Sequence, residues 1–150
     1  PFVIGIMGAG GPVAEYTPQK KRYAGIHQTF RDAMAAPADL PEFKGNVMAV
    51  RTEKYWDMPL EKLRQREAAF KKQKDEINNA MKEKKMTRDE GKAAIEKLYA
   101  DEFNERELVL LRESTSNAEY HYLGSAKIMA QIGKGFAEAN YALLQKQDKK

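Results

Sequence analysis

The chain has 150 residues, 42% hydrophobic and 32% charged, a balance that suits one globular domain and excludes a disordered chain. It contains no cysteine, which excludes disulfides and thiolate metal sites. The net charge is +4, but the charges are interspersed rather than one-signed, and no apolar run approaches the ~20 residues that span a bilayer. We therefore expect neither nucleic-acid binding nor a membrane span.

The first 52 residues alternate between strand and helix patterns. Residues 2–7 are a continuous apolar run that ends in a glycine turn at 8–12, as in a strand buried on both faces. Thr17 and Pro18 then indicate a helix start, and the helix has an apolar stripe made of Tyr23, Ile26, Phe30 and Met34. A second strand is predicted over residues 46–52. This order predicts a parallel pair joined by a right-handed crossover.

Residues 59–112 have the pattern of an antiparallel helical hairpin. A polar helix is predicted over 59–84, and a capping box from Thr87 to Glu90 starts a second helix that ends near 112. Lys and Arg alternate with Asp and Glu throughout, which is typical of a solvated helix surface. Such a hairpin would be inserted into the α/β domain and stand partly clear of it.

A loop at residues 113–124 leads into a last helix over 125–144. Ile128, Ile132 and Phe136 give this helix one apolar face, which would dock on the sheet. Two strands buried on both faces do not form a stable sheet, because such sheets usually have four or more strands. We therefore expect the sheet to be completed by the N-terminal half of the same domain, or alternatively by a partner chain. The abrupt start within an apolar run favours the first.

His121 lies in the loop before the last helix, between two tyrosines. Because the loops at the carboxyl ends of parallel strands collect catalytic residues, a histidine there is well placed to act as a general base. The alternative is a histidine that packs between its tyrosine neighbours. A metal site is not expected, since His121 and the only other histidine, His27, show no ligand spacing, and no cofactor motif is present.

Several segments resemble the C-terminal half of SGNH-type esterases, in particular the sialate O-acetylesterase and carbohydrate esterase family six group. The most specific is "YHYLGSAK" followed by "IGKGFAEA", and "PFVIGIMGAGGP", "FRDAMAAPADLPEFKGNVMAVRT" and "YWD" also match. The resemblance implies an α/β fold, part of a three-layer α/β/α sandwich around a parallel sheet. Residues 1–150 would then be one partial domain, with 59–112 as a helical hairpin insertion.

The resemblance also implies a function, the removal of acetyl groups from acetylated carbohydrates by a serine hydrolase. His121 would be the base, and Asn117 or Glu119 would orient its ring. Gly10, Gly11 and Tyr120 would lie at the sugar-binding pocket. The serine and oxyanion-hole segments of the family have no counterpart in this sequence, so we expect the chain alone to be inactive.

Two further expectations follow from these observations. The resemblance favours a periplasmic or secreted protein, although no signal segment occurs in the sequence. The alternative to an esterase is a non-catalytic interaction or scaffold module, in which the charged hairpin binds a partner protein. Tyr55 and Trp56 could stack on a sugar ring or simply pack in the interior.

Overall fold

The computed structural model describes residues 1–147 and divides into two compact units. The first, which we call the sheet unit, combines residues 1–57 with the described residues from 116 onward. The second, the helical unit, consists of residues 58–115. Within the described residues, no helix is both long enough and apolar enough to cross a membrane.

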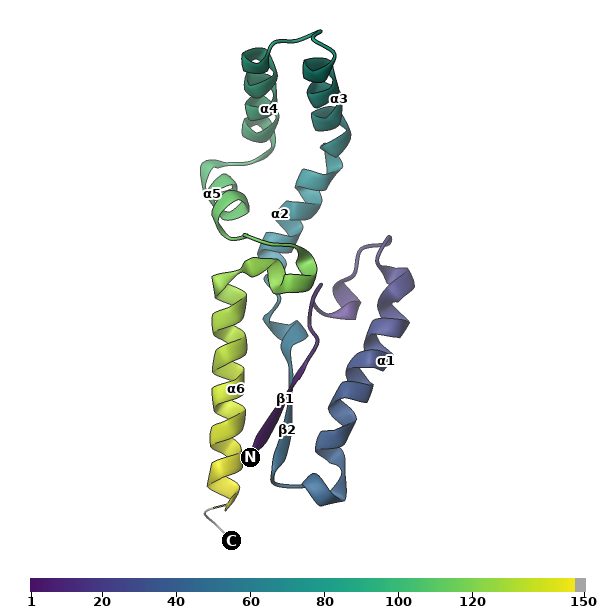
Figure 1. The fold of residues 1–150 in the computed structure, drawn as a ribbon, viewed down its shortest axis with the longest axis vertical. Coiled ribbons are helices and arrows are strands. Elements are labelled where there is room, and N and C mark those ends of the chain that lie inside the picture. The colour runs from purple at the N-terminus through teal and green to yellow at the C-terminus, as the bar shows by residue number, and fades with distance from the viewer. Residues whose placement is uncertain (148–150) are drawn as a thin grey trace. The chain divides into compact units, whose positions relative to one another are not determined.

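The sheet unit contains two strands and two long helices. The strands β1 (Phe2–Ile6) and β2 (Val47–Arg51) lie where the sequence predicts them and pair in parallel, with Phe2 opposite Val47. Figure 1 shows the helices α1 (Ala24–Ala35) and α6 (Ala126–Gln147) on either side of this pair. Short 3-10 helices connect them; the two that bear on the site are η5 (Thr52–Tyr55) and η6 (Glu119–Gly124).

The core of the sheet unit lies mainly between the strands and α6. Its fully buried side chains include Ile6, Leu123, Ile128 and Leu143. Gly5 has no side chain where α6 crosses β1, and a Cβ there would lie 2.6 Å from the ring of Phe136. The glycine therefore lets the helix pack closely against the strand.

The prediction of a three-layer α/β/α sandwich is wrong for this chain. Helices account for 71% of the structure, and the sheet of the described residues has only two strands. The sequence contains just two apolar runs with strand character, and the rest of the sandwich was implied by the resemblance alone. The other segments have helical periodicity and fold accordingly.

Helix α1 differs from its sequence pattern in two ways. It begins at Ala24, because the residues before it form turns and a short 3-10 helix over Lys21–Tyr23. In the turn, the Thr17 carbonyl accepts hydrogen bonds from the backbone N–H groups of Lys20 and Lys21. The predicted stripe does not form the buried face, since Ile26 and Phe30 are exposed. The one buried residue of the helix is Arg31.

The helical unit has four helices rather than the two expected. They are α2 (Met58–Ala69), α3 (Lys71–Lys82), α4 (Arg88–Glu102) and α5 (Glu105–Glu113). The capping box at Thr87 is present, and a second capping box pairs Asn104 with Glu107. This second box starts a new helix, so the helix predicted from residue 87 to about 112 is interrupted.

A small aromatic core holds the helical unit together. Phe70 lies at the break between α2 and α3, and Phe103 lies at the break between α4 and α5. Their rings contact each other at 6.0 Å between centroids, and Leu63 is buried beside them. Arg66 lies over the Phe103 ring and bonds to Glu102 and Glu107. The two helix breaks thus place the rings of Phe70 and Phe103 in one hydrophobic cluster.

Candidate functional site

The loop that carries His121, residues 116–125, lies at the carboxyl ends of both strands. The Tyr122 hydroxyl accepts a hydrogen bond from the backbone N–H of Gly8, at 2.8 Å, and lies 2.9 Å from the Thr52 hydroxyl. Gly8 follows β1 and Thr52 follows β2. Thr52 donates its own proton to the Ile6 carbonyl, so Tyr122 donates to Thr52. One tyrosine hydroxyl therefore ties the His121 loop to the end of each strand.

The same loop contains a left-handed turn. Tyr122 and Leu123 have φ values of 52° and 61°, and Gly124 follows at 58°. For residues with a side chain this conformation costs roughly 1–2 kcal/mol each. The Leu123 carbonyl accepts bonds from the backbone N–H groups of residues 116 and 117, and the Leu123 side chain is buried. Burial and these bonds hold the turn in place, and strain maintained in this way often occurs at functional sites.

The His121 imidazole is exposed. Its ring lies 4.4 Å from the ring of Tyr120, which is itself 73% exposed. The backbone N–H of His121 donates to the Ala118 carbonyl, and among residues 1–147 no group forms a hydrogen bond with the ring nitrogens. The ring is therefore accessible to a hydroxyl group from outside the chain.

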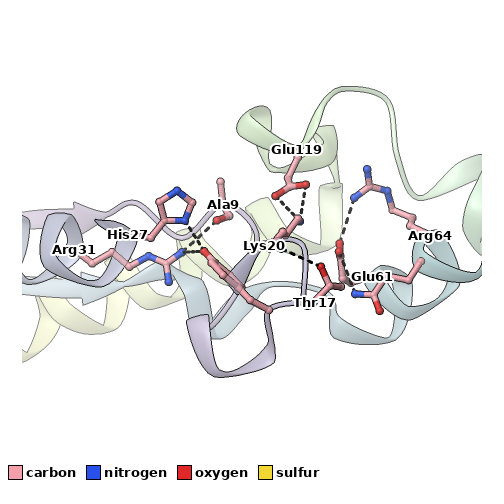
Figure 2. A network of polar contacts seen from close by, with 10 residues as sticks. Ala9, Thr17, Lys20, His27, Arg31, Glu61, Arg64 and Glu119 are labelled. Carbon is pink, nitrogen blue, oxygen red and sulfur yellow. Dashed lines mark hydrogen bonds and ion pairs between the residues drawn. The ribbon is translucent and has the colours of Figure 1, made fainter. Parts of the chain in front are cut away.

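In the part of the chain that the structure describes, neither of the two candidates for orienting the ring forms a hydrogen bond with it. Both carboxylate oxygens of Glu119 accept hydrogen bonds from the Lys20 ammonium at 2.8 Å, as Figure 2 shows. The Asn117 side chain accepts a bond from the backbone N–H of Ala118. Glu119 thus joins the His121 loop to the segment before α1, and the acid of a triad stays unassigned.

Gly10 and Gly11 are buried beneath the His121 loop. Both have positive φ, at 82° and 77°, and a Cβ on Gly10 would lie 2.9 Å from a carboxylate oxygen of Glu119. In this structure they let the turn after β1 approach the His121 loop, and the exposed residue of the predicted sugar-binding set is Tyr120. Their predicted contact with substrate stays a prediction.

A buried arginine organises the turn after β1, and the sequence patterns did not single it out. The Arg31 guanidinium donates to the Met7 carbonyl. It also donates to the Ala9 carbonyl and to the Tyr16 hydroxyl, which in turn bonds to His27 Nδ1 (Figure 2). A buried cation is costly unless its N–H groups are hydrogen-bonded, and here carbonyl oxygens accept them.

Glu53 is a second residue that the sequence patterns missed. It follows β2, and one of its carboxylate oxygens lies 3.6 Å from Arg51. The other oxygen is buried and has no hydrogen-bond partner among the described residues. Such an oxygen is a vacant acceptor at the same edge of the sheet as His121.

Trp56 and Tyr55 support the site from inside and do not form a platform. Trp56 is 5% exposed, and its ring contacts that of Tyr122 at 6.3 Å between centroids. The Tyr55 hydroxyl packs against Gly135 of α6. Ser125 is buried and Ser116 bonds to the Gly124 carbonyl, so these two serines of the loop have structural contacts.

The part of the chain that the structure describes contains no group of three His, Asp or Glu side chains that could hold a metal ion. Comparisons of the chain with protein-family models, with curated proteins and with solved structures gave no match, so a relation to the SGNH-type esterases stays a prediction.

Proposed function

We propose that this chain carries the histidine-bearing part of a carbohydrate O-acetyl esterase. The serine nucleophile and its oxyanion donors would come from the N-terminal half of the same domain or from a partner chain, which would also complete the sheet. The main support is the bond network of Tyr122, which fixes the loop of an exposed histidine at the carboxyl ends of two parallel strands. Chemistry in open α/β sheets gathers at that edge.

The geometry suits His121 for proton transfer. Its ring would accept the proton of the serine hydroxyl as the serine oxygen attacks the acetyl carbonyl, and would return that proton to the sugar oxygen that leaves. Water would then attack the acetyl carbonyl of the acylated serine while His121 takes one of its protons. The bond between the acetyl carbon and the serine oxygen would break, and His121 would return the proton to that oxygen, which leaves acetic acid and the free serine. Tyr120, exposed beside the imidazole, would offer its ring to the apolar face of the sugar.

The experiment uses the full polypeptide that the gene encodes, with acetylated sialic acid and p-nitrophenyl acetate as substrates. We expect turnover by the full polypeptide and none above background by residues 1–150. His121→Ala in the full polypeptide should reduce kcat on the order of 10³-fold or more, with KM nearly unchanged. Free imidazole should restore part of the lost rate, because it can accept the proton in place of the missing ring. It would not restore a role of His121 in packing.

Two outcomes would overturn the proposal. The first is turnover by residues 1–150 that disappears with His121→Ala, since the base would then act without the missing serine. The second is a full polypeptide that hydrolyses neither ester, or whose activity does not depend on His121. That result would favour the interaction module, and binding through the charged surface of the helical unit would become the question to test.

A further inference from the structure

The helices α3 and α4 pack against each other in the helical unit and are joined by a short turn, as Figure 1 shows. Among their described residues, α3 has none that is buried, and Gly91 is the one buried residue of α4. The aromatic core of Phe70 and Phe103 lies at the opposite ends of the two helices, away from the turn. The turn end of this helix pair therefore depends on few contacts.

One contact at the turn end joins the thioether of Met81 on α3 to Gly91 on α4. A Cβ on Gly91 would overlap the Met81 sulfur and would lie 2.6 Å from its Cγ. The Met81 side chain thus occupies the space that a side chain at position 91 would fill. Glycine inside a helix costs about 0.5–1 kcal/mol relative to alanine, so close packing of Met81 offsets a loss of helix propensity here.

The Met81 side chain is nevertheless only half-buried and lines two open grooves of the helical unit. One groove, of about 580 Å³, is also lined by Lys82 and Arg88. The other, of about 370 Å³, is also lined by Lys84 and Met86. Both are many times larger than the roughly 30 Å³ that a water molecule occupies in the liquid. A small oxidant such as hydrogen peroxide can therefore reach this side chain.

We propose that Met81 is a site of reversible oxidation by peroxides, and that its oxidation opens the turn end of the α3–α4 pair. The sulfur attacks one oxygen of the peroxide, the O–O bond breaks, and a sulfoxide forms. With hydrogen peroxide, the departing hydroxide takes the proton of the transferred OH group and leaves as water. The sulfur loses two electrons and the peroxide gains them. Methionine sulfoxide reductases reverse the change.

The sulfoxide does not fit the contact that the thioether makes. A single carbon added to Gly91 already overlaps the sulfur, so no space remains for an additional oxygen on that side. A sulfoxide oxygen is also a hydrogen-bond acceptor, and burying an unsatisfied polar group costs about 1–3 kcal/mol. The oxidised side chain therefore leaves Gly91, while the contact between Phe70 and Phe103 at the other end persists. The inference concerns the helical unit alone and stands whether or not His121 is a catalytic base.

The first measurement is the oxidation itself, in the full polypeptide treated with hydrogen peroxide while folded. Trypsin separates the two methionines at the turn end, because Met81 falls in "DEINNAMK" and Met86 in "MTR". We expect "DEINNAMK" to gain one oxygen atom. Met129, which is 44% exposed, is the internal reference. If "DEINNAMK" is still unmodified when Met129 is fully oxidised, the Met81 sulfur is not accessible and the proposal fails.

The second measurement is amide hydrogen exchange before and after oxidation. Oxidation should accelerate exchange over residues 77–82 and 90–95 by about 10-fold or more, leave the sheet unit unchanged, and be reversed by a sulfoxide reductase. Met81→Leu, similar in size and resistant to peroxide, should retain slow exchange after the same treatment. Met86→Leu is the matched control and should open as the unaltered protein does. Met81→Gln, which is polar without any oxidant, should exchange rapidly from the start.

Two results would overturn the proposal. Unchanged exchange in a protein whose Met81 is fully oxidised would show that the contact with Gly91 does not hold the two helices together. Accelerated exchange that persists in Met81→Leu after peroxide treatment would show that oxidation of another residue opens the pair.

Discussion

Replacing Tyr122 with phenylalanine should loosen the His121 loop from the sheet without changing the packing of the ring. The substitution removes one oxygen atom and with it the bonds to the Gly8 N–H and the Thr52 hydroxyl. Thr52 retains a partner because it still donates to the Ile6 carbonyl. The Gly8 N–H is left buried without an acceptor, which is the larger part of the cost.

The expected loss can be worked out from these contacts. An unsatisfied buried donor costs about 1–3 kcal/mol, and a typical hydrogen bond contributes about 0.5–1.5 kcal/mol. We therefore expect Tyr122→Phe to reduce the free energy of unfolding of the sheet unit by about 1.5–4.5 kcal/mol.

Trp56 provides the assay. It is the only tryptophan of the chain, it is buried in the sheet unit and its ring contacts Tyr122. Its fluorescence during urea denaturation therefore reports the unfolding of this unit. Tyr120→Phe is the matched control, since Tyr120 is largely exposed and surface changes usually alter stability by less than about 0.5 kcal/mol. Equal midpoints for the two variants would refute the anchoring role of the Tyr122 hydroxyl.

Two further predictions concern the strand end and the helix caps. Gly8→Ala should destabilise the sheet unit by about 3 kcal/mol, because its Cβ would overlap the backbone nitrogen of Glu53. Gly25→Ala, with open space around it, should stabilise α1 by up to about 1 kcal/mol, and equal Tm shifts for the two variants would contradict this reasoning. Backbone hydrogen bonds from the cap residues lower the pKa of Glu90 and of Glu107. Because these pKa values are depressed on folding, the stability that the caps confer is complete above the ordinary glutamate pKa of about 4.3 and is lost as the pH falls through the lowered values. Amide shifts at residues 87 and 104 should titrate with midpoints below about 4.3, and midpoints at or above that value would disprove the linkage.

The sequence predicts what depends on local patterns and misses what depends on tertiary contacts. Continuous β-branched runs identified both strands, and a Thr and a Glu three residues apart identified the cap at Thr87. The second cap pairs Asn104 with Glu107, which are also three residues apart, so the sequence contains its signal. The apolar residues on both sides of it nevertheless favour one long helix. Arg31 could not be placed, because only the folded turn after β1 supplies the carbonyls that make its burial tolerable.

In the candidate site, too, features set by local patterns are predictable and features set by tertiary contacts are not. A loop at the carboxyl ends of parallel strands was predictable for His121, since strand order and the last helix constrain where that loop lies. The role of Tyr122 was not, because its partners at Gly8 and Thr52 lie 114 and 70 residues away in the sequence. Glu119, one of the two candidates for orienting the imidazole, pairs with Lys20, and this contact depends on the fold.

The helical unit interrupts the sheet unit between Asp57 and Ser116, and this arrangement has a consequence for chain entropy. Closing a loop costs free energy that grows only with the logarithm of its length, about 0.6 kcal/mol for each doubling. Asp57 also pairs with Lys127 at 2.8 Å, which brings the chain on both sides of the interruption together within the sheet unit itself. A segment of almost any length can therefore connect these two points at little cost, and the helical unit could be shortened, lengthened or exchanged over generations while the His121 loop stays fixed to its strands.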